Sequence, residues 1–210
     1  MNAPRQLIEG FARFRGNHFS TEDVMYRNLV EQGQAPKFLI VGCCDSRVDP
    51  ALIFDCAPGD LFVLRNVANL VPPAEDRVGH HGTTAALEYG VRTLGVEHIV
   101  VLGHAHCGGI HNLMDSQGLS SPNSFIDDWM SLVESARASV MLDFVDASEE
   151  QRQRACEQRA ILVSLQNLQT FPWISQRVEQ GTLTLHGWYF DIEQGQLLGY
   201  DASTRQFAKL

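Results

Sequence analysis

KFLIVG (37–42) and HIVVLG (98–103) are the two stretches that decide the fold of this chain of 210 residues. Each is continuously apolar, which is typical of a strand covered on both faces in a parallel sheet. Further strands are predicted at 61–69, 183–192 and 196–201. The last of these follows a turn at Gly195 and returns as an antiparallel edge strand.

Helical patterns alternate with these strands, and they are predicted at 4–15, 21–33, 82–94, 123–142 and 148–170, the last of them ended by Phe171-Pro172. The alternation predicts an α/β fold with a mostly parallel central sheet of four strands plus an antiparallel edge strand, and helices on both faces. At this length we expect a single domain over 1–210, with an N-terminal helical arm over 1–35 and an α/β core over 36–210.

Composition and charge narrow the class of protein. Apolar residues make up 44% of the chain and charged residues 20%, a balance typical of soluble globular domains. The net charge of −9 and the lack of a Lys/Arg cluster argue against binding to nucleic acid or to an anionic membrane. No apolar run reaches membrane-spanning length, and the five cysteines are an odd number without framework spacing. A reducing cytoplasmic location is therefore expected.

Two short clusters carry the chemistry, and each ends a predicted strand. Cys43 and Asp45 lie in CCDSR, and His104 and Cys107 lie in GHAHCGG. Since the carboxyl ends of parallel strands meet at one edge of a sheet, the two clusters are expected to converge. Two thiolates, an imidazole and a carboxylate suit tetrahedral Zn²⁺, so one zinc per chain is predicted.

Arg47 decides what such a zinc could do. The two thiolates already cancel the formal charge of Zn²⁺, and a third anionic ligand would close the site. If Arg47 holds the Asp45 carboxylate, one metal position stays open for water, which is the mark of a catalytic zinc. Asp45 thus has two predicted roles: zinc ligand in a shut state, and acceptor from zinc-bound hydroxide in an open state. Thiolate ligands acidify that water less than imidazoles do, so activity is expected to rise toward alkaline pH.

The pattern CxDSR with GHxxCGG resembles the beta-class carbonic anhydrases, and further blocks of similar sequence follow in the same order over roughly residues 33–192. The resemblance implies a zinc enzyme that reversibly hydrates CO2 to bicarbonate and a proton through a zinc-bound hydroxide. Cys43, His104 and Cys107 would be permanent ligands, with Asp45 and Arg47 as the gating pair.

The resemblance also implies a substrate pocket shared between subunits. Gln34 matches a glutamine that donates a hydrogen bond to substrate, and Phe62, Val67 and Tyr89 match apolar walls for CO2. Gly108 would offer its backbone N–H to a bicarbonate oxygen. Because such pockets use two subunits, a homodimer or higher homo-oligomer is implied, with the N-terminal helices packing on the partner subunit.

Some bacterial members of the family bind bicarbonate at a second, non-catalytic site built from a tryptophan, an arginine and a tyrosine. Here Ile40 and Phe190 occupy the first and third positions, and only Arg65 remains. The resemblance is therefore to the plant-like type with an open zinc. Two alternatives stay open: the same site acting on CS2 or COS, and a non-catalytic zinc module.

Overall fold

A computed structural model describes residues 4–19, 24–74, 81–115 and 124–210 of the chain. Its contacts divide the chain into two compact units, Met1–Ala35 and Pro36–Leu210. The first unit holds α1 (Arg5–His18) and α2 (Met25–Gln32), and neither helix buries a residue. Aromatic rings link the two helices, since Phe19 stacks on Tyr26 with ring centroids 4.7 Å apart.

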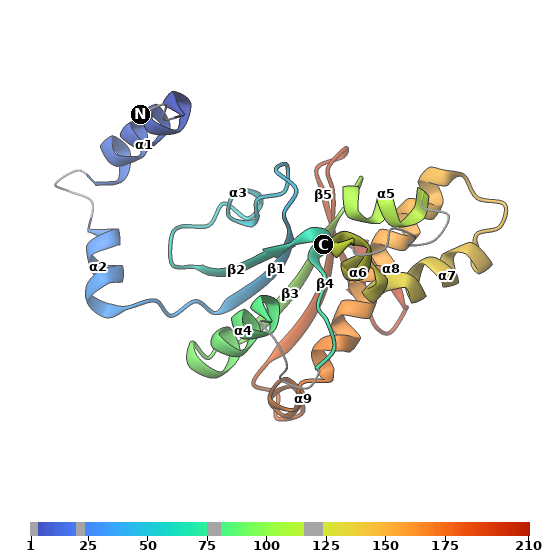
Figure 1. The fold of residues 1–210 in the computed structure, drawn as a ribbon. Coiled ribbons are helices and arrows are strands. Elements are labelled where there is room, and N and C mark those ends of the chain that lie inside the picture. The colour runs from blue at the N-terminus through green and yellow to red at the C-terminus, as the bar shows by residue number, and fades with distance from the viewer. Residues whose placement is uncertain (1–3, 20–23, 75–80, 116–123) are drawn as a thin grey trace. The chain divides into compact units, whose positions relative to one another are not determined.

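The second unit is built on a six-stranded sheet in the order β2-β1-β3-β4-β5-β6 (Figure 1). Its strands are β1 (Phe38–Cys43), β2 (Leu61–Asn66), β3 (His98–His104), β4 (Thr184–Asp191), β5 (Gln196–Asp201) and β6 (Gln206–Lys209). The first four are parallel, and β5 and β6 are antiparallel to their neighbours. The predicted α/β class with a mostly parallel sheet is confirmed.

The prediction was wrong about the edge of this sheet. β5 is an inner strand, because β6 pairs with it antiparallel and forms the edge. The sequence analysis did not predict β6. β6 has only four residues and one half-buried side chain, so it lacks the apolar alternation that marks a strand.

The helices of this unit differ from the prediction mainly where one pattern breaks into several elements. They are α3 (Pro50–Ile53), η1 (Val67–Asn69), α4 (Gly82–Glu88), η2 (Tyr89–Thr93), α5 (Gly108–Asp115), α6 (Phe125–Met130), η3 (Ser131–Val133), α7 (Glu134–Asp143), α8 (Glu149–Gln169) and α9 (Pro172–Glu179). The single helix predicted over 123–142 is α6, η3 and α7. Ser131 Oγ donates to the Asp128 carbonyl at 2.7 Å, and such side-chain bonds compete with a regular helix.

Proline and left-handed residues explain two further differences. Pro172 follows the end of α8 and is also the first residue of α9. Its missing backbone N–H breaks no hydrogen bond there, because the first N–H groups of a helix have no partner within the helix. The strand predicted over 61–69 ends at Asn66, because Ala68 and Asn69 have φ of 60° and 51°. The Asn66 side chain closes this turn by bonding both the N–H and the carbonyl of Leu70 at 2.8 Å.

The helix predicted over 82–94 changes type half-way. It is α-helical to Glu88 and then forms a π turn, in which the Leu94 N–H donates to the Tyr89 carbonyl five residues earlier at 2.9 Å. Gly90 lies in this turn, and a Cβ there would come within 2.4 Å of Leu39 Cδ1. The turn therefore packs its backbone directly on β1.

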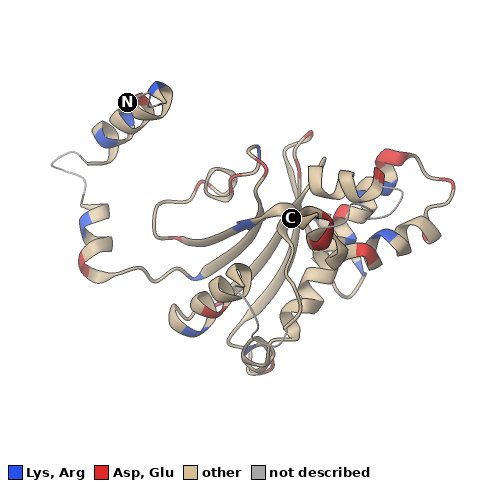
Figure 2. Ribbon diagram, viewed as in Figure 1, with Lys and Arg blue, Asp and Glu red and all other residues tan. Residues whose placement is uncertain are grey.

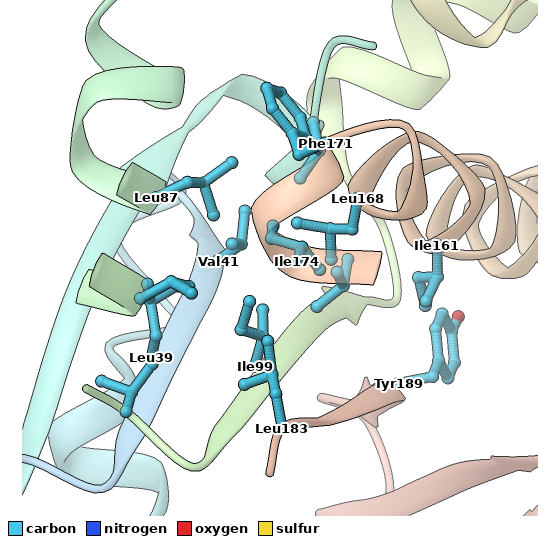
Figure 3. Packing of buried hydrophobic residues seen from close by; sticks show 14 of the residues in the cluster. Leu39, Val41, Leu87, Ile99, Ile161, Leu168, Phe171, Ile174, Leu183 and Tyr189 are labelled. Carbon is cyan, nitrogen blue, oxygen red and sulfur yellow. The ribbon is translucent and has the colours of Figure 1, made fainter. Parts of the chain in front are cut away.

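The main core lies between one face of the sheet and helices α4, α8 and α9 (Figure 3). Leu39 and Val41 of β1 and Ile99 of β3 meet Leu87 of α4 and Leu168 of α8 there. The opposite face of the sheet carries Ile40, Val100 and Leu102, which pack against the α3 segment, Trp188 and Phe190. The strands that carry both clusters are thus held rigidly from two sides.

Charged residues lie mostly on the helices and loops, and few fall on the strands (Figure 2). Basic and acidic residues are interspersed along α8 instead of forming a patch of one sign (Figure 2). Among the described residues, the helices are all too short or too polar to cross a membrane.

Candidate metal centre

Two adjacent strands deliver the first two candidate ligands. Cys43 is the last residue of β1 and His104 the last residue of β3. The strands pair in parallel with Gly42 opposite Leu102, so both side chains emerge at the carboxyl edge of the sheet. Ligand sites of open α/β sheets gather at this edge.

Cys107 joins them from the loop that leads from β3 into α5. The Cys43 Sγ, the Cys107 Sγ and a His104 ring nitrogen all lie within 4.8 Å of one another. The three residues are buried, with 5%, 1% and 2% exposure for Cys43, His104 and Cys107. The structure therefore brings together three of the four predicted zinc ligands, Cys43, His104 and Cys107, and leaves Asp45 outside this group.

The hydrogen bonding of His104 shows that this cluster fits a metal ion. The His104 Nδ1 lies 2.8 Å from the Ala105 carbonyl, which can only accept, so Nδ1 carries the proton. The Nε2 atom is buried without a hydrogen-bond partner among the described residues, and in the neutral imidazole it is the nitrogen left free to accept. A buried polar nitrogen without a partner is unfavourable by about 1–3 kcal/mol, and a metal would satisfy it.

The two thiols influence each other's protonation. A hydrogen bond from the Cys107 thiol lowers the pKa of the Cys43 thiol, with the neighbouring His104 adding to the effect. The same contact and burial raise the pKa of Cys107, against the backbone N–H groups of Ile110 and Gly109, which lower it. Cys43 is therefore the first of the pair to become a thiolate, the form that binds metal.

Asp45 stands apart from the three-residue cluster because Arg47 holds its carboxylate. The Arg47 Nε donates to Oδ1 at 2.9 Å and Nη2 donates to Oδ2 at 2.6 Å, a two-point contact. The hydrogen bond from Arg47 keeps the pKa of Asp45 well below its usual range, so the carboxylate is ionised. Arg47 Nη2 also donates to the carbonyl of His106 at 3.0 Å, which ties the first cluster to the second.

Arg65 braces the turn that carries these residues. Its Nε donates to the Cys43 carbonyl at 2.8 Å and its Nη2 to the Asp45 carbonyl at 2.7 Å. Its Nη1 pairs with Asp49 Oδ2 at 2.9 Å. All three donor groups of Arg65 are thus used within this turn.

A model of the carbonic anhydrase family matches residues 38–197, which include every residue of this cluster. The chain belongs to the beta carbonic anhydrase family. A carbonic anhydrase of Synechocystis sp. is 39% identical over 206 residues, which cover 97% of this chain and 73% of the relative. The predicted family, and with it the prediction of an enzyme, is confirmed.

Solved structures of beta carbonic anhydrases share the fold. The beta carbonic anhydrase CcaA superposes with a TM-score of 0.91 at 37% identity, covering 98% of this chain and 91% of that one. A beta carbonic anhydrase of the ascomycete Sordaria macrospora, described as tetrameric, gives a TM-score of 0.82 at 28% identity, with 93% and 95% covered.

The residues expected to line a carbonic anhydrase pocket fall into two groups. Val67 and Gly108 lie near the metal cluster: Val67 follows the strand partner of Cys43, and its Cγ1 would lie 2.9 Å from a Cβ on Gly109. A Cβ on Gly108 would meet no atom within 4 Å apart from its chain neighbours and its own helix backbone, so none of the described side chains further away packs against its Cα.

Phe62 and Tyr89 lie elsewhere in the same chain. Their rings contact each other with centroids 5.9 Å apart. Phe62 pairs with Leu39, four residues before Cys43 on β1, which is about 13 Å along the strand. Gln34 belongs to the first unit, Met1–Ala35, and is described only within that unit. One chain therefore does not bring Phe62 and Tyr89 to its own metal cluster.

Sequence analysis missed Glu157, a buried carboxylate of α8 with 4% exposure. Its Oε1 accepts from the Cys107 backbone N–H at 3.0 Å, and its Oε2 accepts from the Tyr189 hydroxyl at 2.7 Å. A signal was present, because Glu157, Ile161, Ser164 and Leu168 are spaced 4, 3 and 4 apart and all four are buried. A charged residue within such a stripe indicates a buried partner.

Proposed function

We propose that this carbonic anhydrase family member is a zinc enzyme that reversibly hydrates CO2 to bicarbonate and a proton. The observation that carries the proposal is a buried Cys43, His104 and Cys107 cluster beside a potential fourth ligand, Asp45, that Arg47 holds away. Three ligands and one open position are typical of a catalytic zinc.

Cys43, His104 and Cys107 would hold one zinc ion per chain. The bound ion would supply Lewis-acid activation of water for attack on CO2. Around it, the residues of the chain set charge and access: the two thiolates balance the metal charge, and Arg47 offsets the charge of Asp45. From there, Asp45 is able to accept a hydrogen bond from the attacking water and so orient it.

The pocket is proposed to be completed by a second copy of the chain. Val67 and Gly108 would act beside the metal of their own chain, while Phe62, Tyr89 and Gln34 would come from the partner subunit. This division is supported by the separation of Phe62 and Tyr89 from the cluster. The tetrameric relative also supports an oligomer, as do α1 and α2, which bury no side chain in this chain and would pack on the partner subunit.

We assign the site to the plant-like, open type. Ile40 and Phe190 replace the tryptophan and tyrosine of the non-catalytic bicarbonate site. Arg65 is occupied by the Cys43 and Asp45 carbonyls and by Asp49, which supports a structural role for it. A cytoplasmic location is proposed as well, because all five cysteines are free thiols.

A non-catalytic zinc module is the weaker candidate. A closed structural site would use a fourth protein ligand, and here the predicted fourth ligand, Asp45, is bound at two points by Arg47. Action on CS2 or COS has no feature of the described residues in its favour.

Stopped-flow CO2 hydration on protein of measured zinc content tests the proposal, from mildly acidic to alkaline pH. We expect hydration that scales with zinc content, disappears with a chelator, and rises toward alkaline pH. The matched control is Cys107→Ser, which removes one thiolate while keeping the shape of the side chain. One zinc per chain without hydration at any pH would reject the proposed reaction.

A further inference from the structure

Glu157 lies in the middle of α8 at a buried position, where an apolar side chain would avoid the cost of burying a charge. Its neighbours in the buried stripe are Cys156, Ala160 and Ile161. Burying a carboxylate is unfavourable by several kcal/mol unless donors satisfy it. The carboxylate at this position is therefore expected to bind a group that an apolar residue could not bind.

The three donors to Glu157 identify that partner. Gln153 Nε2 donates to Oε1 at 3.0 Å from one turn earlier on α8. Tyr189, fully buried on β4, donates to Oε2 at 2.7 Å; its ring lies beside Ile161 (Figure 3). The third donor is the backbone N–H of Cys107, which lies between β3 and α5 and has no partner in a strand or helix ladder.

The loop around Cys107 needs such an anchor. His106, directly before it, has a φ of 57°, a left-handed conformation that side chains rarely adopt. The His106 imidazole contacts Glu193 at 2.9 Å and its carbonyl accepts from Arg47 at 3.0 Å. Glu157 fixes the remaining end of this loop, at the residue that bears the sulfur.

Ligand binding by Glu157 itself does not explain its burial. The cavity beside it, lined by Tyr189 and Arg154 among others, has a volume of about 20 Å³. This is room for one water molecule. Arg154 is moreover committed to Asp191, which accepts from its Nη2 at 2.6 Å.

We propose that Glu157, held by Tyr189, is a positioning residue that fixes the backbone of Cys107 and thereby the place of its sulfur in the metal site. The proposal rests on the proposed zinc site. Hydrogen-bond partners that orient metal ligands in this way typically change metal affinity 10- to 100-fold when they are removed.

The test compares full-length variants by two readouts, the visible spectrum of the Co²⁺-substituted protein and the Zn²⁺ affinity from chelator competition. Glu157→Leu should change the Co²⁺ ligand-field bands and weaken Zn²⁺ binding about 10- to 100-fold. Glu157→Gln should stay within about threefold of the parent, because its amide oxygen still accepts from the Cys107 N–H. Thermal unfolding of each variant is followed in parallel.

Ser164→Ala is the matched control. Ser164 is also buried on α8, two turns further on, and its Oγ accepts the backbone N–H of Val71 at 3.2 Å, away from the metal cluster. It should lower the melting temperature and leave both metal readouts unchanged. Unchanged metal readouts in Glu157→Leu, or equal losses in Glu157→Leu and Glu157→Gln, would overturn the proposal.

If Glu157→Leu does not fold, Tyr189→Phe decides. It removes one of the three donors and lets the carboxylate turn, so we expect a several-fold weaker Zn²⁺ affinity and shifted Co²⁺ bands, and parental values would overturn the proposal. A parent protein without thiolate-to-cobalt absorption would instead overturn the proposed zinc site, and this inference with it.

Discussion

Replacing Arg47 by alanine is the sharpest test of the gating pair. The substitution removes two side-chain hydrogen bonds to Asp45, at 2.9 and 2.6 Å, and one to the His106 carbonyl. The backbone N–H of residue 47 still donates to Asp45 Oδ1, so the turn itself is retained. The freed carboxylate is then able to compete for the open metal position.

The size of the effect follows from these contacts. A hydrogen bond to a charged group contributes about 1.5–3 kcal/mol when well shielded. The Arg47 side chain is 52% exposed, so solvent weakens both bonds, and the low end of the range applies. A total of about 2–3 kcal/mol corresponds to a loss of about 30- to 150-fold in kcat for CO2 hydration.

Stopped-flow hydration at one alkaline pH measures this loss, and a double-mutant cycle isolates its cause. In an Asp45→Ala background the added Arg47→Ala should change kcat by less than about threefold, because no carboxylate remains to be released. Arg159→Ala is the control for loss of a partly exposed arginine, since Arg159 pairs with Asp143 at 2.8 Å away from the cluster. Additive effects of Asp45→Ala and Arg47→Ala, or an Arg47→Ala enzyme as fast as the parent, would refute the reasoning.

Three further predictions concern stability. Gly103→Ala should lower the free energy of unfolding in urea by about 1–3 kcal/mol, because its Cβ would lie 2.6 Å from Ile161 Cδ1 in the core; parental stability would contradict this packing. Burial and the neighbouring His98 lower the pKa of His186, so protonation of this imidazole favours the unfolded chain. The melting temperature should therefore fall as the pH drops below about 6.5, and the His186→Gln variant should show a smaller fall. Protein stripped of metal with a chelator should be about 4 kcal/mol less stable than protein in free metal at a thousand times Kd. Calorimetry of the Cys107→Ser variant should show a much smaller difference between the metal-loaded and the stripped protein.

Much of the core was predictable from sequence because its strands are apolar without interruption. β1 and β3 begin and end within one residue of the predicted bounds, and each ends in a cluster residue, Cys43 or His104. Parallel pairing of such strands leaves few ways to arrange the sheet, so the convergence of the two clusters followed. The spacing of Cys107 from His104 then needed only a short loop.

Other features were hidden because no local pattern carries them. The predicted 123–142 helix breaks at Ser131, whose hydroxyl bonds the Asp128 carbonyl, and β6 is too short to show a period. Hydrophobic periodicity also cannot say which copy of a chain a residue serves. The family resemblance alone makes Phe62 and Tyr89 pocket walls. The register of β1 and β2 separates Phe62 from its own Cys43, and Tyr89 contacts Phe62.

The π turn at Tyr89–Thr93 makes the orientation of Tyr89 a matter of chain length. A π turn holds one residue more than an α turn, and each helical residue rotates the chain by about 100° about the axis. Deleting a single residue after Tyr89 would convert the π turn into an ordinary α turn. The Tyr89 ring would then point in a different direction relative to the residues that follow the turn, without any substitution. Substitutions alone cannot produce this change, so insertion or deletion of a residue at this turn is a separate way to reorient the Tyr89 ring.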